Sequence, residues 1–494
     1  MIRQHLPALV IVVPLIAAPL CLLLRRPGLA WAWTLLVTWT VFGMSVLLLR
    51  DVLAGGTVSY HMGGWPPPWG IEYRIDLLSA FMLLLVSGIG AATAVFARDS
   101  VAAEIERPRV YLFYTMFLLC LTGLMGILAT GDAFNLFVFL EISSLSSYVL
   151  IALGPDRRAL VAAFQYLVMG TLGATFILIG IGLLYMITGT LNMLDIAQRL
   201  AALGSNRTSL VAFAFLTIGA SLKLALFPLH LWLPNAYTFA PSAVTAFLAA
   251  TATKISVYIL IRFFFTIFGV SYVVEELTLH WLLMPLALLA IFVASTVAIF
   301  QNNVKRLLAW SSIAQVGYMI LGVSFATVGG LTAGIVHIFN HALIKGGLFM
   351  ALGGVLLRLG STRLDDMAGL GRRMPVTMAA WVVGGLSLIG VPLTSGFISK
   401  WVLVEAALEL GWWPVALLTL AGSLLAIVYV WRVVEVVWFR PAPEGGPEVK
   451  EAPWTMLAPA CLLLGANVWF GLDTSVSLGI AEAAASLLLS SGAP

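Results

Sequence analysis

The sequence predicts an all-α membrane protein that crosses the bilayer about fourteen times. Of its 494 residues, 61% are hydrophobic and 10% are charged, whereas a soluble domain is about a quarter charged. Apolar runs of about 20 residues, the length that a spanning helix needs, recur along the whole chain. No polar stretch is long enough for a soluble domain, so the lipid bilayer is expected to surround most of the chain.

The expected spans follow one another with short connections. They cover residues 7–24, 29–49, 75–97, 110–129, 132–153, 161–188, 209–234, 242–268, 281–300, 306–326, 329–357, 376–410, 412–438 and 455–475. The first is expected to be retained rather than cleaved as a signal peptide, because it ends in Arg25-Arg26 and no polar mature sequence follows. Residues 51–74, with GGWPPPWG, are expected to form an extracytoplasmic connection with a small hairpin, and residues 440–453 a solvated linker.

Basic residues predict the orientation in the membrane. They gather in the connections after odd-numbered spans, as in Arg25-Arg26, Arg157-Arg158 and Arg372-Arg373. The connections after even-numbered spans hold only Arg50, Arg74, Arg199 and Arg207. By the positive-inside rule, the odd connections face the cytoplasm and both termini lie outside it.

Cysteine usage and net charge exclude several other classes of protein. Cys21, Cys120 and Cys461 lie in apolar runs without CxxC spacing, so neither a disulfide framework nor a metal cluster is expected. The net charge of +4 follows from the basic connections and indicates no nucleic-acid partner.

Ionisable side chains inside the expected spans are the strongest functional signal. They are Glu141, Lys223, Lys254, Arg262, Lys345 and Lys400, together with His230, His337 and His341. Each charge at the bilayer centre costs about 3 kcal/mol on insertion scales, so such groups mark functional sites, above all where they can pair. Glu141 is expected roughly 13 Å below Asp132, near mid-membrane, where it can pair with Lys223. Asp132 itself is expected to cap a helix.

The segment HIFNHALIK spaces three basic side chains four residues apart. On a helix this spacing puts His337, His341 and Lys345 on one face. Imidazoles titrate near neutral pH, which suits a proton relay. A polar packing stripe and a metal site are the alternatives, but no third metal ligand lies nearby in the sequence.

Two spans are expected to break near their middle, each beside a lysine. Pro228 follows Lys223, while Pro392 and Gly396 precede Lys400. Irregular backbone at membrane depth is tolerated only where it faces protein or a wet cavity. Paired broken helices in corresponding halves point to a transport site and an inverted repeat. The intramembrane lysines and histidines are therefore expected to form a polar axis that carries protons.

The stretch KLALFPLHLWLPNAYTFAPSAVTAFLAATATK strongly resembles the signature of the antiporter-like subunits shared by respiratory complex I and Mrp-type cation/proton antiporters. The resemblance covers about residues 70–440. It implies that Glu141 pairs with Lys223, and that Lys254, His337, His341, Lys345 and Lys400 continue the proton path. It also implies fourteen helices with two inverted five-helix repeats, each with a broken helix. The corresponding divisions are 1–106, 107–270, 271–440 and 441–494.

Within the family, the NHALIK string and Lys400 are more similar to the D-type Mrp subunit than to the complex I subunits that lack those lysines. D-like subunits also occur in membrane-bound hydrogenase and related complexes, and the motifs do not exclude those. No long lateral helix is expected after the fourteenth span.

The resemblance implies a proton-translocating subunit of a multisubunit Na⁺ or K⁺/H⁺ antiporter in a prokaryotic plasma membrane. Its expected partners are other membrane subunits, including a second antiporter-like chain. The alternative is a proton-pumping subunit of a redox complex, so an enzymatic parent complex stays open. A self-contained solute transporter is the weakest alternative. The sequence has no cluster motif or dinucleotide fingerprint, and no cofactor is expected.

The sequence leaves the roles of three further residues open. Asp132 is one of several scattered oxygen donors for a transported cation. Glu405 is either a local partner of Lys400 or a surface acid. Arg262 is either buried or extends its head group to the outer end of its span.

Overall fold

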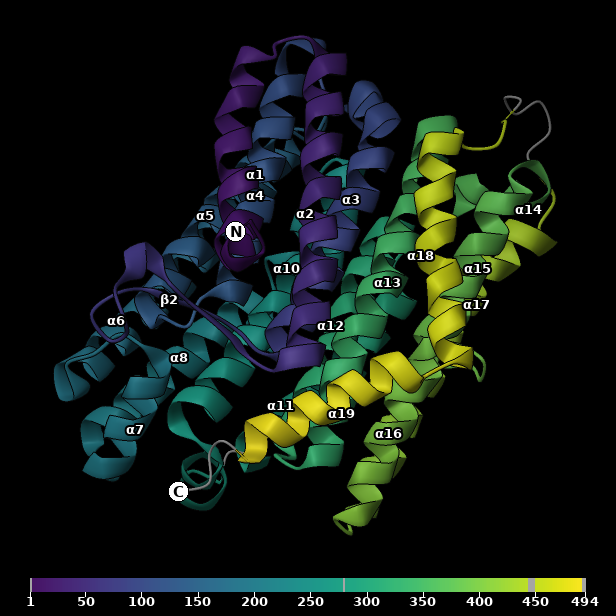
Figure 1. The fold of residues 1–494 in the computed structure, drawn as a ribbon. Helices are drawn as coiled ribbons and strands as arrows, with labels where there is room; N and C mark the ends of the chain where they lie inside the picture. Colours follow the sequence, from purple (N-terminus) through teal and green to yellow (C-terminus); the bar gives the residue numbers. More distant parts are fainter. Residues whose placement is uncertain (1, 279, 443–448, 491–494) are drawn as a thin grey trace.

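The computed structural model describes residues 2–278, 280–442 and 449–490, and within them the chain is almost wholly helical (Figure 1). Thirteen of its helical segments are long and apolar enough to cross a membrane. They are α1 (Leu6–Leu23), α2 (Pro27–Gly55), α3 (Leu77–Glu104), α4 (Val110–Ala129), α5 (Ala133–Ala152), α6 (Arg158–Thr188), α8 (Arg207–Leu224), α10 (Ser242–Ile261), α11 (His280–Ile299), α12 (Val304–Ser324), α13 (Val328–Leu359), α17 (Trp413–Val434) and α18 (Trp454–Leu472). The predicted fold class is confirmed.

Polar side chains and prolines mark where these helices begin. Asp132 accepts a hydrogen bond from the backbone N–H of Asn135, so it caps α5 as expected. Asn206 and Ser209 form a reciprocal capping box at the start of α8. Proline occupies the first turn of α2 and α17, where its missing N–H is not needed.

Two helices are interrupted where the sequence predicts breaks. The expected span 209–234 ends as a helix at Leu224, and only the short α9 (Leu233–Phe239) follows before α10. The expected span 376–410 splits into α15 (Pro375–Ile389) and α16 (Ser395–Glu409). Neither half is long enough to cross a membrane alone, which is why thirteen segments qualify rather than fourteen. The inverted symmetry of the two halves stays a prediction.

Several shorter elements were not predicted, some of them outside the expected spans and some at the ends of these spans. They are the amphipathic α7 (Met193–Leu203), the short α14 (Leu370–Arg373), the C-terminal α19 (Ser475–Ser490), the π-helices η4 (Arg262–Phe268), η5 (Tyr272–Glu276) and η7 (Glu435–Phe439), and the 3₁₀ turns η1 (Ile2–His5), η2 (Met62–Gly64), η3 (Arg107–Arg109) and η6 (Asp365–Met367). Figure 1 shows α19 lying across the lower ends of the spans. The expected hairpin is present as β1 (Val58–His61) and β2 (Glu72–Ile75), paired antiparallel.

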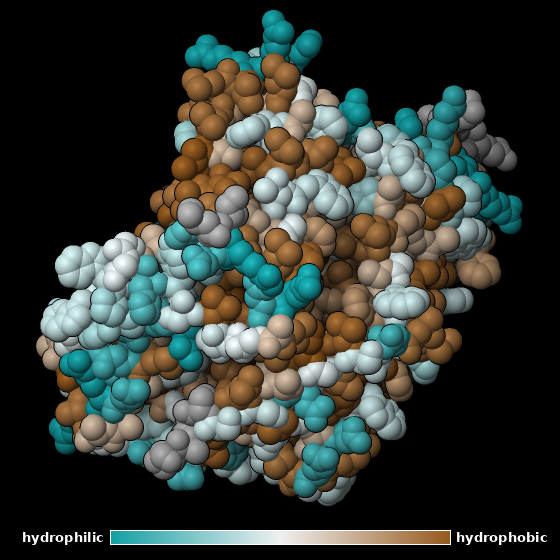
Figure 2. All heavy atoms as spheres, in the orientation of Figure 1, coloured by the Kyte–Doolittle hydropathy of each residue, from teal (hydrophilic) through white to brown (hydrophobic). Residues whose placement is uncertain are grey.

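Two helices that carry buried polar side chains, α10 and α12, are the most enclosed of the spans. In α10 with η4, and in α12, 94% of the most apolar stretch is buried, against 39% in α2 and α6. The central helices are therefore wrapped by the peripheral ones, whose apolar side chains cover most of the visible surface (Figure 2). Hydrophilic residues gather at the top of this view, where α1 and α2 are connected.

Two cavities show that the connections alternate between two ends of the bundle. One cavity of about 260 Å³ is lined by Glu104, Asp156, Asn303 and Gly360, which lie at the connections after α3, α5, α11 and α13. We call this end the basic face, because it carries the Arg-rich connections. A second cavity of about 150 Å³ is lined by Thr57, Arg74, Thr130, Met193 and Thr266, and by the leucines of α19. We call that end the hairpin face.

Candidate functional site

The first ionisable pair joins α5 to α8. The Lys223 ammonium lies 3.4 Å from the Glu141 carboxylate and donates to the Ser144 hydroxyl at 2.7 Å. Lys223 is 3% exposed, whereas the Glu141 side chain keeps 25% exposure at the bundle surface. Lys223 lies in the last turn of α8, where unpaired carbonyls favour a cation. The structure thus brings together the two residues expected to pair.

Two further lysines are buried in the central helices without an acid. The Lys254 ammonium on α10 donates to the Ala249 carbonyl and, at 3.3 Å, to the Thr253 hydroxyl. The Lys345 ammonium on α13 donates to the Leu308 carbonyl at 2.8 Å and to the Ser311 hydroxyl. Among the described residues, neither lysine has a carboxylate within 4.0 Å.

The two histidines of α13 lie one turn apart with parallel rings. Their centroids are 6.0 Å apart. One ring nitrogen of His337 is hydrogen-bonded to the Ser399 hydroxyl at 2.8 Å, and the other to the Gln315 side-chain oxygen at 2.9 Å. Within the described part of the chain, neither ring nitrogen of His341 has a hydrogen-bond partner. His337 therefore links α12, α13 and α16, while His341 keeps both nitrogens available.

The last lysine of the series lies at the α15–α16 break. The Lys400 ammonium donates to the carbonyls of Leu388 and Ile389 at 3.0 and 2.9 Å, and lies 4.7 Å from the Tyr318 ring centroid. These carbonyls belong to the final turn of α15, which ends where Gly390 adopts a positive φ of 93°. A broken helix thus offers its free carbonyl end to a lysine.

The secondary candidates fall outside this series. His230 is buried between α8 and α9, with its ring 5.2 Å from that of Phe227 and 5.3 Å from that of Trp310. Asp132 caps α5. Glu405 is exposed on α16, and the polar partners of Lys400 in the described residues are carbonyls instead. Pro228 lies in the turns between α8 and α9, and Pro392 between α15 and α16.

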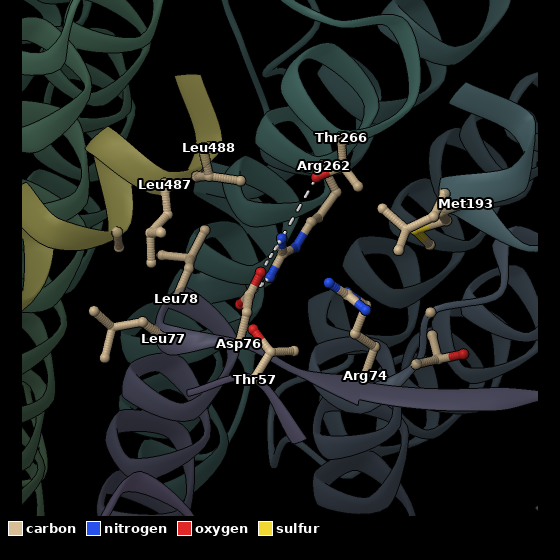
Figure 3. A pocket seen from close by; sticks show the side chains of 14 residues that line it. Thr57, Arg74, Asp76, Leu77, Leu78, Met193, Arg262, Thr266, Leu487 and Leu488 are labelled. Carbon is tan, nitrogen blue, oxygen red and sulfur yellow. Dashed lines mark hydrogen bonds and ion pairs between the residues drawn. The ribbon is translucent and has the colours of Figure 1, made fainter. Parts of the chain in front are cut away.

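Arg262 is buried rather than extended to the surface. Its guanidinium donates two hydrogen bonds to Asp76, at 2.5 and 2.6 Å, and a third to the Ser79 hydroxyl at 2.8 Å. Figure 3 shows the pair at the wall of the hairpin-face cavity, with Arg74 turned toward the same space. Arginine stays protonated in proteins, so this pair is a fixed ionic contact.

Sequence reasoning missed the uncharged partners of the site. Ser144, Gln315, Tyr318 and Ser399 all contact a lysine or histidine of the series. Of these four residues, only Gln315 stands out in the sequence, because it is a glutamine in the middle of a spanning helix. The others are common residues that gain a role through packing between distant helices.

This fold and its buried cations define a polytopic membrane subunit of the antiporter-like class. A family described as "NADH:quinone oxidoreductase/Mrp antiporter, TM" matches residues 130–426. The N-type subunit of the NADH-quinone oxidoreductase of Desulforudis audaxviator is 41% identical over 481 residues, which cover 94% of this chain and 95% of the relative. The D-type subunit of the Na⁺/H⁺ antiporter of Bacillus subtilis is 31% identical over 447 residues, with 90% and 89% covered.

A solved structure shares nearly the whole fold. A chain of the Mrp complex from Dietzia sp. superposes with a TM-score of 0.91 at 27% identity, over 99% of this chain and 98% of that one. The chain belongs to the NADH:quinone oxidoreductase/Mrp antiporter family. It is a multi-pass membrane protein of the Mrp or complex I type.

Proposed function

We propose that this chain is a proton-translocating subunit of a multisubunit monovalent cation/proton antiporter. The observation that carries the proposal is the burial of four lysines of spanning or broken helices, each at most 6% exposed: Lys223, Lys254, Lys345 and Lys400. Among the described residues, only Lys223 has a carboxylate partner. A lysine held by carbonyls and hydroxyls can release and regain a proton without leaving an acid buried and unpaired.

One small space beside Lys223 supports the proposed path. A cavity of about 20 Å³ lies between Lys223 and α10, and Ser143, Ser144, Ser147 and Ser256 line it. About 10–15 Å³ is enough for one water when polar partners are present. A single water in this cavity would join Lys223 to the helix of Lys254. Farther along, the stacked rings of His337 and His341 lead from Lys345 toward Lys400.

Two parent complexes fit the family. The TM-score of 0.91 to a chain of an Mrp complex, together with Lys345 and Lys400, supports a Na⁺ or K⁺/H⁺ antiporter. The 41% identity to a chain named as part of an NADH-quinone oxidoreductase supports a redox-driven complex as the second candidate. Gentle purification of the tagged chain separates the two: a colourless assembly supports the antiporter, and flavin or iron–sulfur absorbance supports the redox complex.

The axis itself is tested by substitution in the assembled complex. Lys223→Ala should abolish proton transport in membrane vesicles while the amount of complex stays unchanged, because the ion pair in the lysine series is lost. Lys450→Ala, an exposed lysine of the linker, is the matched control and should keep the full rate. Retained transport in Lys223→Ala would refute the proposed path.

Orientation and internal repeats belong to the same proposal. The basic face lies toward the cytoplasm, and the hairpin face lies outside in a prokaryotic plasma membrane. Residues 107–270 and 271–440 form the two inverted repeats. The structure supports this division by placing one interrupted helix, α8–α9 or α15–α16, in each half.

A further inference from the structure

Two charged residues next to basic connections are packed into the bundle. Glu104 ends α3, and Lys305 lies in the first turn of α12 with 5% exposure. The sequence places both beside loops, where a solvated position is the ordinary expectation. Within the described residues, Lys305 has no carboxylate within 4.0 Å.

Both residues hold the joint between α9 and α10. The Lys305 ammonium donates to the Ala240 carbonyl at 2.5 Å, directly after α9. The Glu104 carboxylate accepts from the backbone N–H of Ser242, the first residue of α10, at 2.9 and 3.1 Å, and from the Ser100 hydroxyl at 2.7 Å. Each charge therefore meets the helix end of opposite partial charge.

A cavity on the basic face opens above this joint. Its volume of about 260 Å³ leaves room for several waters. The other charged groups that line it are Asp156, Arg158 and Arg363. A hydrogen bond from Arg158 holds the pKa of Asp156 below its ordinary value, so Asp156 stays ionised and paired at neutral pH. Glu104 is the remaining acid at the cavity wall.

Two hydroxyl groups, those of Thr245 and Tyr237, bind backbone carbonyls near the joint and near Lys254. The Thr245 hydroxyl lies in the first turn of α10 and donates to the Tyr237 carbonyl at 2.9 Å. The buried Tyr237 hydroxyl donates to the Leu248 carbonyl at 3.2 Å. The Lys254 ammonium donates to the next carbonyl, that of Ala249. The Tyr237 hydroxyl and the Lys254 ammonium thus bind the carbonyls of two consecutive residues of α10.

We propose that Glu104 is the proton-uptake residue on the basic face, that Lys305 positions the α9–α10 joint beside it, and that the hydroxyls of Thr245 and Tyr237 pass the proton to Lys254. A proton from cavity water binds the Glu104 carboxylate. It then moves over the two hydroxyls, with water between them, and ends on the Lys254 amine. Only O–H and N–H bonds form and break, and one proton is transferred in all.

This inference rests on the proposed function, so its test must separate the two. The intact complex is placed in vesicles with the basic face outward, and initial proton uptake is followed with a pH-sensitive dye between external pH 6 and 9. Glu104→Gln should lose on the order of 100-fold in rate, the lower end of what a positioned proton-transfer group contributes. Tyr237→Phe, which keeps the ring and removes the hydroxyl, should also slow uptake. Formate, a small acid that fits the cavity, should restore part of the rate in Glu104→Gln.

The control lies two residues away. Glu106 follows the same helix, is exposed and pairs with Arg109 at 3.4 Å, and Glu106→Gln should keep the full rate. If Lys254→Ala transports normally, the proposed function fails. If Lys254→Ala is inactive while Glu104→Gln matches Glu106→Gln at every pH, the uptake site is refuted. Glu104→Gln could also lose proton uptake that formate does not restore and unfold at a lower temperature. That result would assign Glu104 a structural role alone and would also overturn the proposal.

Discussion

Most lysine ammonium groups in this bundle are held by helix carbonyls rather than by acids. Lys254 and Lys345 donate to the carbonyls of Ala249 and Leu308, and Lys400 donates to the open end of α15. Carbonyl dipoles stabilise a cation without adding a full opposite charge. The charge on such a lysine can therefore change without breaking a salt bridge, which is what a proton carrier requires.

Arg262 differs from these lysines, because it is paired with a carboxylate. It cannot release its proton, and its carboxylate partner Asp76 caps α3. Asp76→Ala should destabilise the protein by about 3–5 kcal/mol, because a buried guanidinium loses its counter-ion. The measurement is the thermal unfolding of the purified protein. Asp195→Ala removes the partially exposed partner of Arg199 and should cost less than about 1 kcal/mol.

A double substitution isolates the ionic contact. Asp76→Ala combined with Arg262→Met removes both charges and should recover much of the lost stability. Equal losses for Asp76→Ala and Asp195→Ala would contradict the assignment of Arg262 as a buried, paired charge.

At the scale of elements, sequence patterns predicted the helices that are formed by apolar runs of about 20 residues. They located the spans, both breaks and the hairpin, because each leaves a signal in neighbouring residues. They missed α7 and α19, which are 11 and 16 residues long. Amphipathic or alanine-rich helices of that length are shorter than the stretch that a hydropathy pattern needs.

The sequence predicted those features of the site that depend on the spacing of residues within one helix. The face shared by His337, His341 and Lys345 follows from their spacing of four. The roles of Gln315 and Ser399 depend on α12 and α16 meeting α13, which no single segment encodes. Glu104 and Lys305 lie within a few residues of loops, and only the packing of the α9–α10 joint buries Lys305.

The α15–α16 break depends on a close backbone approach at Gly396. A Cβ there would lie 1.9 Å from the Ser387 carbonyl oxygen, so the two half-helices would have to separate. Gly396→Ala should cost about 1–3 kcal/mol as overpacking and lower the transport rate, because the carbonyls that hold Lys400 move with α15. Unfolding temperature and proton uptake measure the two effects.

Gly465→Ala is the matched control for that substitution. Gly465 is also helical, in α18, and nothing lies within 4 Å of an added Cβ. Its stability should change by no more than about 0.5 kcal/mol. A Gly396→Ala protein that is as stable and as active as Gly465→Ala would show that the break tolerates the added methyl group.

At the scale of the whole molecule, the polar series lies between two unlike faces. The basic face holds the cavity of about 260 Å³ with Glu104, and the hairpin face holds the cavity of about 150 Å³ with Asp76 and Arg262. The N-terminal turn meets the hairpin through a hydrogen bond between His5 and Tyr60. The C-terminal α19 lines the hairpin-face cavity. The described ends of the chain thus share one face.

The membrane orientation of these faces decides the direction of transport. Single cysteines report it: Asp365→Cys lies exposed on the basic face, and Thr57→Cys and Ser205→Cys lie exposed on the hairpin face. An impermeant maleimide added to intact cells should label the two hairpin-face cysteines, and should label Asp365→Cys only after permeabilisation. The unsubstituted chain is the blank, because Cys21 and Cys120 are buried and Cys461 is only partly exposed. The reverse labelling would place Glu104 outside the cell and turn its proposed uptake role into one of release.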